Sequence, residues 1–579
     1  MQNIEEKQLM QKLNSEEYPV SEQEEGTQND KSRNQIVFED VDEVLVKIGG
    51  FSKFQFFSFT IIVTGMAAGA FILYNLYYFE KEPTYMCRYN QQSSYKICTS
   101  EEICDDANVV ESYFIDWTDE GSLHNWVEQL DLKCRSSIAV SFIGSSFFFG
   151  AFIGSFILPR ASDVYGRRPM FLVGLVLYLI VIIGLVFNTS LYLTYVLLLL
   201  GGISETGRYY VAYVYCVEMM PDKYQNLSGL LIFVVFGCLQ ILFSIYFWFI
   251  SKEWINLAYM GGALSIISFI LTIWKLPESP RFYFSKKRFD EARVVLLHIA
   301  KFNGKSDINY FVFESETQYD NKNLLENNGN NEIGQAAGEN EFKGSMLSQQ
   351  TQQKLGINVL KDTTIDFTRD PTAAEPRLSE KQKIIQIELQ LKGTLGELFK
   401  NKTYLRNLLI MTTIWSFGSF GFFFIPFYLD TLKGNTYLFA IFSGSAELLA
   451  SLACILVTRC MTLKQSIILF CGISCAASFA IIFAFGSTDI LVAVLILFNN
   501  FGITSTFDVA YLLNTQMFPT IFLGTAYGFC NIVGRFISIM SPIIAKIVHP
   551  YPLIIMVIFS GISATLALLL KRMPDQIDK

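Results

Sequence analysis

The chain has 579 residues and a net charge of −8, and 51% of its residues are hydrophobic, 15% aromatic and only 17% charged. Soluble globular domains usually carry about 25% charged residues, so this composition excludes an ordinary soluble protein. The acidic balance gives no sign of a nucleic-acid partner.

Residues 1–45 are polar and acidic and predict a disordered cytoplasmic tail. Twelve apolar stretches follow, each long enough to cross a bilayer as a helix. They lie near 54–79, 138–158, 170–187, 191–217, 228–250 and 256–275, and near 407–428, 437–458, 466–485, 490–515, 525–546 and 552–570. The sequence therefore predicts an all-α membrane protein with twelve transmembrane helices.

The helices group into two bundles of six. We assign 46–275 to the N-terminal bundle, 276–402 to a cytoplasmic linker, 403–572 to the C-terminal bundle and 573–579 to a short tail. Basic residues follow every second span: Arg160, Arg167, Arg168, Lys223, Lys286, Lys287, Arg288, Lys571 and Arg572. By the positive-inside rule, both termini are cytoplasmic.

The loop at 80–136 is long and faces outward in this topology. It contains four of the eleven cysteines: Cys87, Cys98, Cys104 and Cys134. An even cysteine count in an outside loop predicts two disulfides in one of three pairings; free thiols are the alternative. A loop suited to disulfides favours the plasma membrane as the location.

The linker begins with an expected amphipathic helix from Phe289 to Ile299 and continues into an Asn- and Gln-rich insertion at about 314–358, which predicts disorder. Gly304-Lys305-Ser306 resembles the end of a phosphate-binding loop, but Ile299 stands where the first glycine is required. We therefore expect no ATP-driven pump. No cluster of metal ligands and no nucleophile–base pair stands out, so we expect neither metal, cofactor nor enzymatic activity.

Two segments 298 residues apart share one pattern. Tyr213 to Pro221 and Tyr511 to Pro519 repeat a tyrosine, an acid or amide, a methionine and a proline at identical spacing. So wide a repeat indicates duplicated halves rather than a solenoid. Duplicated halves in a membrane protein favour a transporter with its site between them.

Gly154 to Arg168 resembles the signature loop of the major facilitator superfamily, and Pro277 to Arg281 resembles the motif that follows the sixth span in its sugar and organic-ion branches. Together with Tyr511 to Pro519 and Gly534 to Pro542, the ordered set resembles the organic cation/anion/carnitine transporter family. The resemblance implies the major facilitator fold and alternating access.

The resemblance also implies a latch of charged residues at the cytoplasmic helix ends. Its members would be Asp163, Gly166, Arg167, Arg168, Glu218, Glu278 and Arg281. The alternative is solvated charges that merely obey topology. The chain departs from the family pattern at Pro159, Val164, Gln225, Gln516 and Leu523, which predicts a weaker latch on the C-terminal side.

Five ionisable residues fall well inside spans, where each costs at least about 2.5–3.5 kcal/mol on insertion scales. Glu205 and Arg208 lie three residues apart and can pair with each other. Glu447 is a candidate for proton relay or for helix packing. Arg535 can hold a substrate carboxylate or pair structurally with Asp508.

Aromatic and amide residues complete the expected binding site. The candidates beside Arg535, Asp508 and Glu447 are Tyr74, Asn75, Tyr213, Phe420, Phe501 and Tyr511. Aromatic faces can hold a cationic group, although in so phenylalanine-rich a chain packing or lipid contact is the alternative for each ring.

The sequence thus predicts a multi-pass secondary transporter, active or facilitative, for small organic ions. Anions or zwitterions of the carnitine or betaine kind are favoured, with a proton or counter-ion as a possible partner and a monomer as the expected state. A sugar-type or inorganic-ion facilitator is one alternative. A receptor or interaction protein on the same fold is the other.

Overall fold

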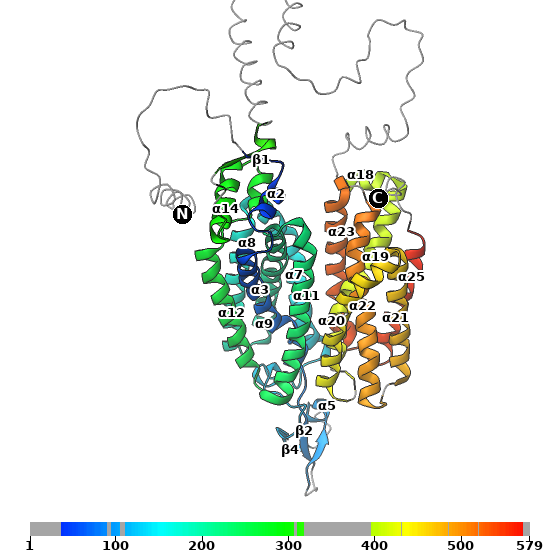
Figure 1. The fold of residues 1–579 in the computed structure, drawn as a ribbon. Helices are drawn as coiled ribbons and strands as arrows, with labels where there is room; N and C mark the ends of the chain where they lie inside the picture. The colour runs from blue at the N-terminus through cyan, green and yellow to red at the C-terminus, as the bar shows by residue number, and fades with distance from the viewer. Residues whose placement is uncertain are drawn as a thin grey trace, which may run out of the picture.

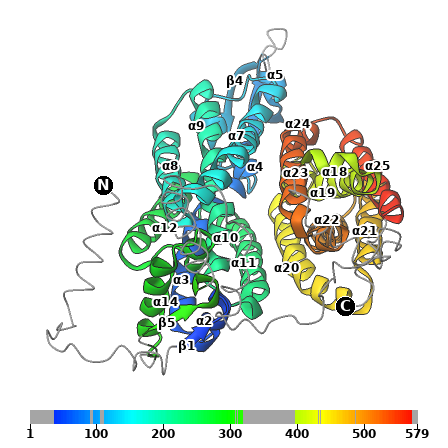
Figure 2. The ribbon, with the colours of Figure 1, turned by 90° about the horizontal axis from the view of Figure 1, so that it is seen from above.

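The computed structural model describes residues 36–89, 94–104, 110–305, 308, 310–317, 395–429, 431–432, 434–484, 486–518 and 520–570. The predicted tails, apart from 36–45, and nearly all of the predicted insertion lie outside the described residues. Within the described part the chain forms two helical bundles side by side (Figures 1 and 2).

The N-terminal bundle contains α3 (Lys53–Leu73) with α4 (Leu76–Phe79), α7 (Ser137–Tyr165), α8 (Arg167–Phe187), α9 (Leu191–Glu205) with η1 (Thr206–Val211) and α10 (Ala212–Glu218), α11 (Asp222–Ile245) with η2 (Tyr246–Ile250), and α12 (Trp254–Lys275). The C-terminal bundle contains α19 (Lys402–Leu429), α20 (Thr436–Cys460), α21 (Leu463–Ala484), α22 (Asp489–Met517), α23 (Thr520–Ser538) with α24 (Ser541–Ala545), and α25 (Tyr551–Leu568).

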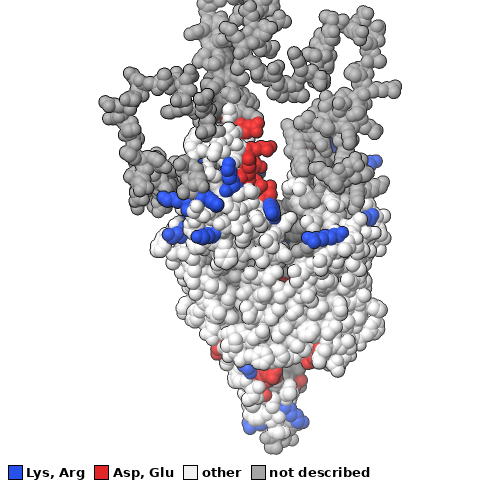
Figure 3. Space-filling model, in the orientation of Figure 1, with Lys and Arg blue, Asp and Glu red and all other residues white. Residues whose placement is uncertain are grey.

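Ten of these helices are long and apolar enough to cross a membrane in the described residues. The interrupted helix from Leu191 to Glu218 and α23 lie in the same bundles and complete the predicted twelve. On the face shown in Figure 3, a broad belt is almost free of charged side chains, and Lys and Arg are concentrated at the end predicted to be cytoplasmic. The predicted fold class is confirmed.

Small residues let the helices approach closely. A Cβ atom added at Gly150 of α7 would lie 1.9 Å from the carbonyl oxygen of Leu199, and one at Gly202 of α9 would lie 1.9 Å from that of Phe147. In lipid, where no hydrophobic effect drives helices together, such close backbone contact is a main source of association energy.

Two spans differ from the sequence prediction. The second helix continues seven residues beyond 158, through Pro159, so that Asp163 lies on a helix rather than in a loop. The eleventh span breaks after Ser538, and α24 begins at Ser541 with Pro542 in its first turn. A proline suits this position because the first turn of a helix leaves its N–H groups unbonded.

A small cytoplasmic module corrects the predicted tail and linker. β1 (Ile36–Phe38) pairs in parallel with β5 (Phe311–Phe313), and α2 (Val41–Lys47) follows it. Disorder is therefore wrong for residues 36–45, because Phe38 and Val41 carry enough apolar surface to be buried despite their acidic neighbours. The predicted amphipathic helix is confirmed as α14 (Phe289–Phe302), and α13 (Pro280–Ser285) precedes it.

The outer loop folds onto the N-terminal bundle. β2 (Tyr85–Tyr89), β3 (Lys96–Cys98) and β4 (Val110–Ile115) form an antiparallel sheet, flanked by α5 (Ser100–Cys104) and α6 (Trp126–Gln129). Disulfides join Cys87 to Cys98 and Cys104 to Cys134, which selects one of the three possible pairings. The Asn125 amide donates to the carbonyl oxygens of Tyr78 and Lys81 at 2.8 and 2.7 Å.

The bundles meet at the membrane centre and on its outer side. Tyr437, at the start of α20, lies against Tyr78 and Trp248 at ring distances of 5.7 and 6.1 Å, and its hydroxyl donates to the Glu120 carbonyl at 2.8 Å. Deeper in, the Gln240 amide of α11 donates to Ser443 of α20 at 3.4 Å. The outer side is therefore closed.

The cytoplasmic half of the seam is open. Gly528 and Gly524 lie seven and eleven residues before Arg535 on α23, and so share its helix face. Arg535 touches the N-terminal bundle, but a Cβ atom added at either glycine would have no neighbour within 4 Å. The bundles diverge toward the cytoplasm, and the protein faces inward.

A cross-link can test this conformation. A Cβ atom at Gly444 would lie 3.3 Å from that of Gln240, close to the separation in a disulfide. We expect Gln240→Cys with Gly444→Cys to cross-link under oxidation and to separate again when the bond is reduced. Thiol labelling of the denatured protein, read as a gel shift, measures the bond.

The matched control is Gln240→Cys with Gly528→Cys, which should not cross-link, because Gly528 has open space around it. Failure of the first pair to cross-link, or equal cross-linking of both pairs, would contradict the inward-facing assignment.

Candidate functional site

Arg535 lies at the seam between the bundles. It comes from α23, is only 6% exposed, and its guanidinium sits 4.6 Å from the centre of the Tyr210 ring in the opposite bundle. Phe423 of its own bundle lies 5.5 Å away on α19. Among the described residues no carboxylate forms an ion pair with it. Rings can hold a guanidinium but cannot neutralise its charge.

Asp508 does not supply that missing charge. Its Oδ2 atom accepts from the Ser451 hydroxyl at 3.4 Å within the C-terminal bundle. The structural pair of Arg535 with Asp508, one of the two sequence alternatives, is therefore not formed in this conformation. Asp508 lies eight residues, or about two turns, beyond Asn500 toward the cytoplasm.

Glu447 also lies at the seam. Its carboxylate, on α20, is 8% exposed and interacts with the Asn500 side chain on α22 and with the Tyr74 hydroxyl of the opposite bundle. The Asn500 amide nitrogen donates to the Ser443 carbonyl oxygen at 2.9 Å. No basic side chain in the described part of the chain pairs with Glu447 or Asp508.

Glu205 and Arg208 pair inside the N-terminal bundle. Arg208 donates to the Glu205 carboxylate and, at 2.9 Å, to the Met66 carbonyl, and it lies over the Tyr178 ring. Both side chains are almost fully buried. Because each charge has a partner, we assign this pair a structural role.

The remaining predicted lining residues separate into two groups. Tyr74, Asn75, Tyr213 and Tyr511 form one, and Phe420 and Phe501 form the other. Tyr74 contacts Phe422 across the seam at 6.4 Å, and Asn75, at the break between α3 and α4, has a buried Oδ1 atom with no hydrogen-bond partner in the described chain. Tyr213 places its hydroxyl against Gly229 of α11, and the Tyr511 ring lies 4.3 Å from that of Trp415.

Phe420 and Phe501 are not brought to this site. Phe420 is buried against Phe559 of α25 and lines an apolar groove of about 300 Å³ beside α24. Phe501 packs on Phe470 of α21 at 5.8 Å. For Phe420 the rotation of α19 decides this, because its neighbours Phe422 and Phe423 occupy the faces toward the other bundle.

Sequence reasoning missed Tyr210, Phe423 and Asn500. Tyr210 lies in η1, a π-helical turn, and such turns are frequent at functional sites but leave little trace in a single sequence. For Asn500 a signal existed: the consecutive amides Asn499 and Asn500 fall in the middle of an apolar span, where polar side chains need partners.

At the cytoplasmic end, Arg167 gathers two acids. It pairs with Glu218 at 3.1 Å and with Asp163 at 3.0 Å. The Glu218 side chain is 18% exposed and the Asp163 side chain 65%, so the Glu218 pair carries most of the energy; an exposed pair contributes only about 0.2–1 kcal/mol. All three residues belong to the N-terminal bundle.

Glu278 caps the start of α8. Its carboxylate accepts from the backbone N–H groups of Arg167 and Arg168 at 3.0 and 3.2 Å and from that of Ser279 at 2.9 Å. A negative charge at a helix N-terminus is favourable, although burial raises the pKa of the Glu278 carboxyl. Gly166 permits this contact, since its φ is +111° and a Cβ atom would lie 2.2 Å from the carboxylate.

Arg281 forms a separate network. It pairs with Asp222 at 2.7 Å and with Asp42 of α2 at 3.1 Å, and Asp42 also accepts from the backbone N–H of Asp222. Arg168 donates to the Ile273 carbonyl at 2.8 Å. The predicted gating residues thus form two clusters on one bundle, and sequence reasoning missed Asp42 and Asp222 as members.

We expect Gly166→Ala to lower stability, because the new methyl group would displace Glu278 and alanine is strained at positive φ. A loss of about 1–3 kcal/mol is the scale for such strain. Thermal melting in detergent measures it. Gly528→Ala, at an open helical position, should melt like the unaltered protein; equal melting of both variants would contradict the packing described.

Comparison with known proteins identifies the family of this chain. The profile of the Major Facilitator Superfamily matches residues 128–542. Among curated relatives, "Organic cation transporter 1" of Caenorhabditis elegans is 24% identical over 76% of this chain and 65% of its own length, so the chain spans slightly less than two thirds of that protein. "Organic cation transporter-like protein" of Drosophila melanogaster is 24% identical over 91% and 89%. Human "Organic cation/carnitine transporter 2" is 24% identical over 78% and 71%.

Solved structures support the fold alone. The inward-open xylose transporter XylE from E. coli has a TM-score of 0.51 and 14% identity, covering 90% of this chain and 98% of its own. The family profile covers more than two thirds of the present chain. The protein therefore belongs to the major facilitator superfamily of multi-pass membrane transporters and, within it, resembles the organic cation and carnitine transporters.

Proposed function

We propose that this protein carries small organic ions across the membrane by alternating access, with carboxylate-bearing anions and zwitterions favoured. The observation that carries the proposal is Arg535, a buried guanidinium at the seam whose contacts are rings from both bundles. An unpaired charge at this depth is costly, and a substrate carboxylate would relieve the cost by binding to the planar guanidinium through two hydrogen bonds.

A zwitterion suits the rest of the seam better than a simple anion. Glu447 offers a negative charge on α20, Tyr74 interacts with it from the opposite bundle, and Phe422 contacts the Tyr74 ring. A quaternary ammonium is held well by such a combination. One curated relative bears the name of an organic cation/carnitine transporter, which is consistent with a carnitine- or betaine-like solute.

The driving force can be the solute gradient, exchange, or proton coupling. Proton coupling is favoured by Glu447 and Asp508, two membrane-embedded carboxylates without basic partners in the described chain. Asp508 lies nearer the open cytoplasmic side, so a proton could pass from the seam toward it. We propose the plasma membrane as the location, because the outer loop carries two disulfides, and a monomer as the functional unit.

The residues of the seam argue against the sugar and inorganic-ion alternatives. A sugar site would be expected to depend on amide and hydroxyl groups rather than on an unpaired guanidinium. A non-transporting receptor would bind the same solutes without flux. Flux and binding must therefore be measured together.

We expect Arg535→Ala to lower uptake of carboxylate-bearing solutes in reconstituted vesicles at least about tenfold, because each hydrogen bond to a charged group contributes about 1.5–3 kcal/mol. Arg535→Lys should retain part of the uptake, because lysine keeps the positive charge but cannot form the two parallel hydrogen bonds of a guanidinium. A screen of labelled carnitine, betaines, dicarboxylates and simple quaternary amines measures the effect.

The matched control is Arg160→Ala, an exposed arginine at the cytoplasmic end of α7. Unchanged uptake of every carboxylate-bearing solute in Arg535→Ala would refute the assignment. Binding without flux in the unaltered protein would favour the receptor.

To test proton coupling, we impose a pH gradient with the acidic side outside the vesicles. We expect this gradient to accelerate uptake in the unaltered protein and to have no effect in Glu447→Gln, because the glutamine side chain has nearly the same shape as glutamate but cannot carry the proton. Asp508→Asn reports whether the second carboxylate takes part. Persistence of the pH-gradient effect in the double variant would exclude both residues as the proton route.

A further inference from the structure

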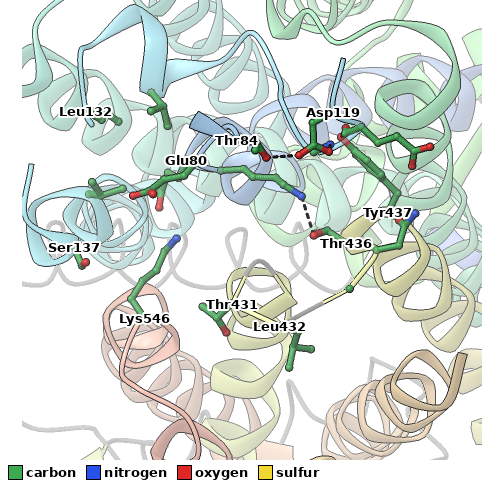
Figure 4. Close-up of a pocket in the computed structure, with 18 of the residues that line it drawn as sticks. Glu80, Thr84, Asp119, Leu132, Ser137, Thr431, Leu432, Thr436, Tyr437 and Lys546 are labelled. Atoms are coloured by element: carbon green, nitrogen blue, oxygen red, sulfur yellow. Dashed lines mark hydrogen bonds between the residues drawn. The ribbon is translucent and has the colours of Figure 1, made fainter. Parts of the chain in front are cut away.

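The larger of the two cavities described here lies outside the closed seam rather than at its centre. Its volume is about 590 Å³, within the range of roughly 300–1,000 Å³ that is typical of small-molecule sites. The N-terminal bundle and the outer loop form one wall, and the turn before α20 and the residue after α24 form the other (Figure 4). We call this cavity the outer vestibule.

The lining of the outer vestibule is strongly charged with both signs. Its ionisable residues are Glu80, Lys81, Glu82, Asp119, Glu120, Arg135 and Lys546. Lys546 and Glu80 point toward one another at one end, while Asp119 lies at the other end beside Thr84 (Figure 4). The mixture of charges excludes an apolar ligand and disfavours one that carries a single charge.

Several of these groups retain hydrogen-bonding capacity. Asp119 accepts from the Gly121 N–H at 3.0 Å and from the Thr84 hydroxyl, and a carboxylate has about four acceptor sites. Lys81 is already engaged, since it donates to Thr436 at 2.8 Å and lies over the Tyr437 ring. Arg135, at the start of α7, is exposed and forms no ion pair within the described chain.

We propose that the outer vestibule binds a small organic zwitterion from the extracellular side. The anionic group of the ligand is received by Arg135, and its cationic group by Asp119 and Glu120. Lys546 of the opposite wall faces Glu80 and adds positive charge to the same cavity. This site is separate from Arg535 and lies on the opposite side of the outer closure.

The occupied vestibule would also act on transport, and this consequence rests on the proposed function. Lys81 to Thr436 and the Tyr437 hydroxyl to the Glu120 carbonyl are contacts between its two walls. If the outer side opens, Thr436 and Lys546 move away with the C-terminal bundle and the site is lost. A ligand that binds the closed state must stabilise it, so external zwitterion slows the return to the outward-facing state.

The binding test uses purified full-length protein and labelled carnitine as the probe zwitterion, measured by equilibrium dialysis. In Arg535→Ala, where the central site is impaired, we expect saturable binding to persist. Adding Arg135→Gln or Lys546→Gln should weaken that binding at least about tenfold, whereas adding Lys96→Gln, an exposed outer-loop lysine outside the cavity, should leave it unchanged.

Arg135 is the decisive position because its exposed side chain can change without disturbing the fold. The Gln240→Cys and Gly444→Cys cross-link gives a second measurement. We expect the cross-linked protein, closed on its outer side, to bind the probe as well as the reduced protein does. Binding that disappears in Arg535→Ala, or that ignores Arg135→Gln and Lys546→Gln, would overturn the proposal. These outcomes do not depend on uptake, so failure of the vestibule and failure of the transport proposal are distinguishable.

Discussion

The contact between Arg535 and Tyr210 is the interaction on which the architecture of the site depends. The Arg535 guanidinium belongs to one bundle and contacts the face of the Tyr210 ring in the other, within the membrane-spanning part of the protein. The ring replaces only part of the hydration that the guanidinium has given up, and the Glu205 carboxylate acts on the charge of Arg535 without forming an ion pair with it.

The polar groups of the protein fall into two sets: those at the seam between the bundles, and the charged residues around Arg167 and Glu278 at the cytoplasmic end, which we call the cytoplasmic clamp. The seam holds sparsely bonded groups, Arg535, Glu447 and Asn75, next to moving surfaces. The cytoplasmic clamp holds densely bonded ones, in which Arg167 and Glu278 fasten the ends of neighbouring helices within the N-terminal bundle. Dense bonding suits a body that moves as a unit, and sparse bonding suits the surface across which substrates pass.

The sequence was sufficient for the twelve spans and for Arg167, Glu218 and Glu278 at their ends, because length, apolarity and charge bias act locally along the chain. It was not sufficient for rotation about each helix axis. Phe420 and Phe423 are indistinguishable in an apolar run, yet one faces α25 and the other faces Arg535. The burial of Phe38 in an acidic tail was missed for a related reason: its partner strand at Phe311–Phe313 lies more than 270 residues away.

The π-helical turn at Thr206–Val211 makes the helix that follows it sensitive to the insertion or deletion of a single residue. An α-helix advances about 100° and 1.5 Å with each residue, so deletion of one residue from this turn would rotate everything after it by that amount. Glu218 would then swing away from Arg167, although it lies seven residues beyond the turn and at the membrane surface. The positions of Glu218 and Arg167 relative to one another are thus set at the depth of Arg535 and Tyr210, and an insertion or deletion in this turn would separate the pair.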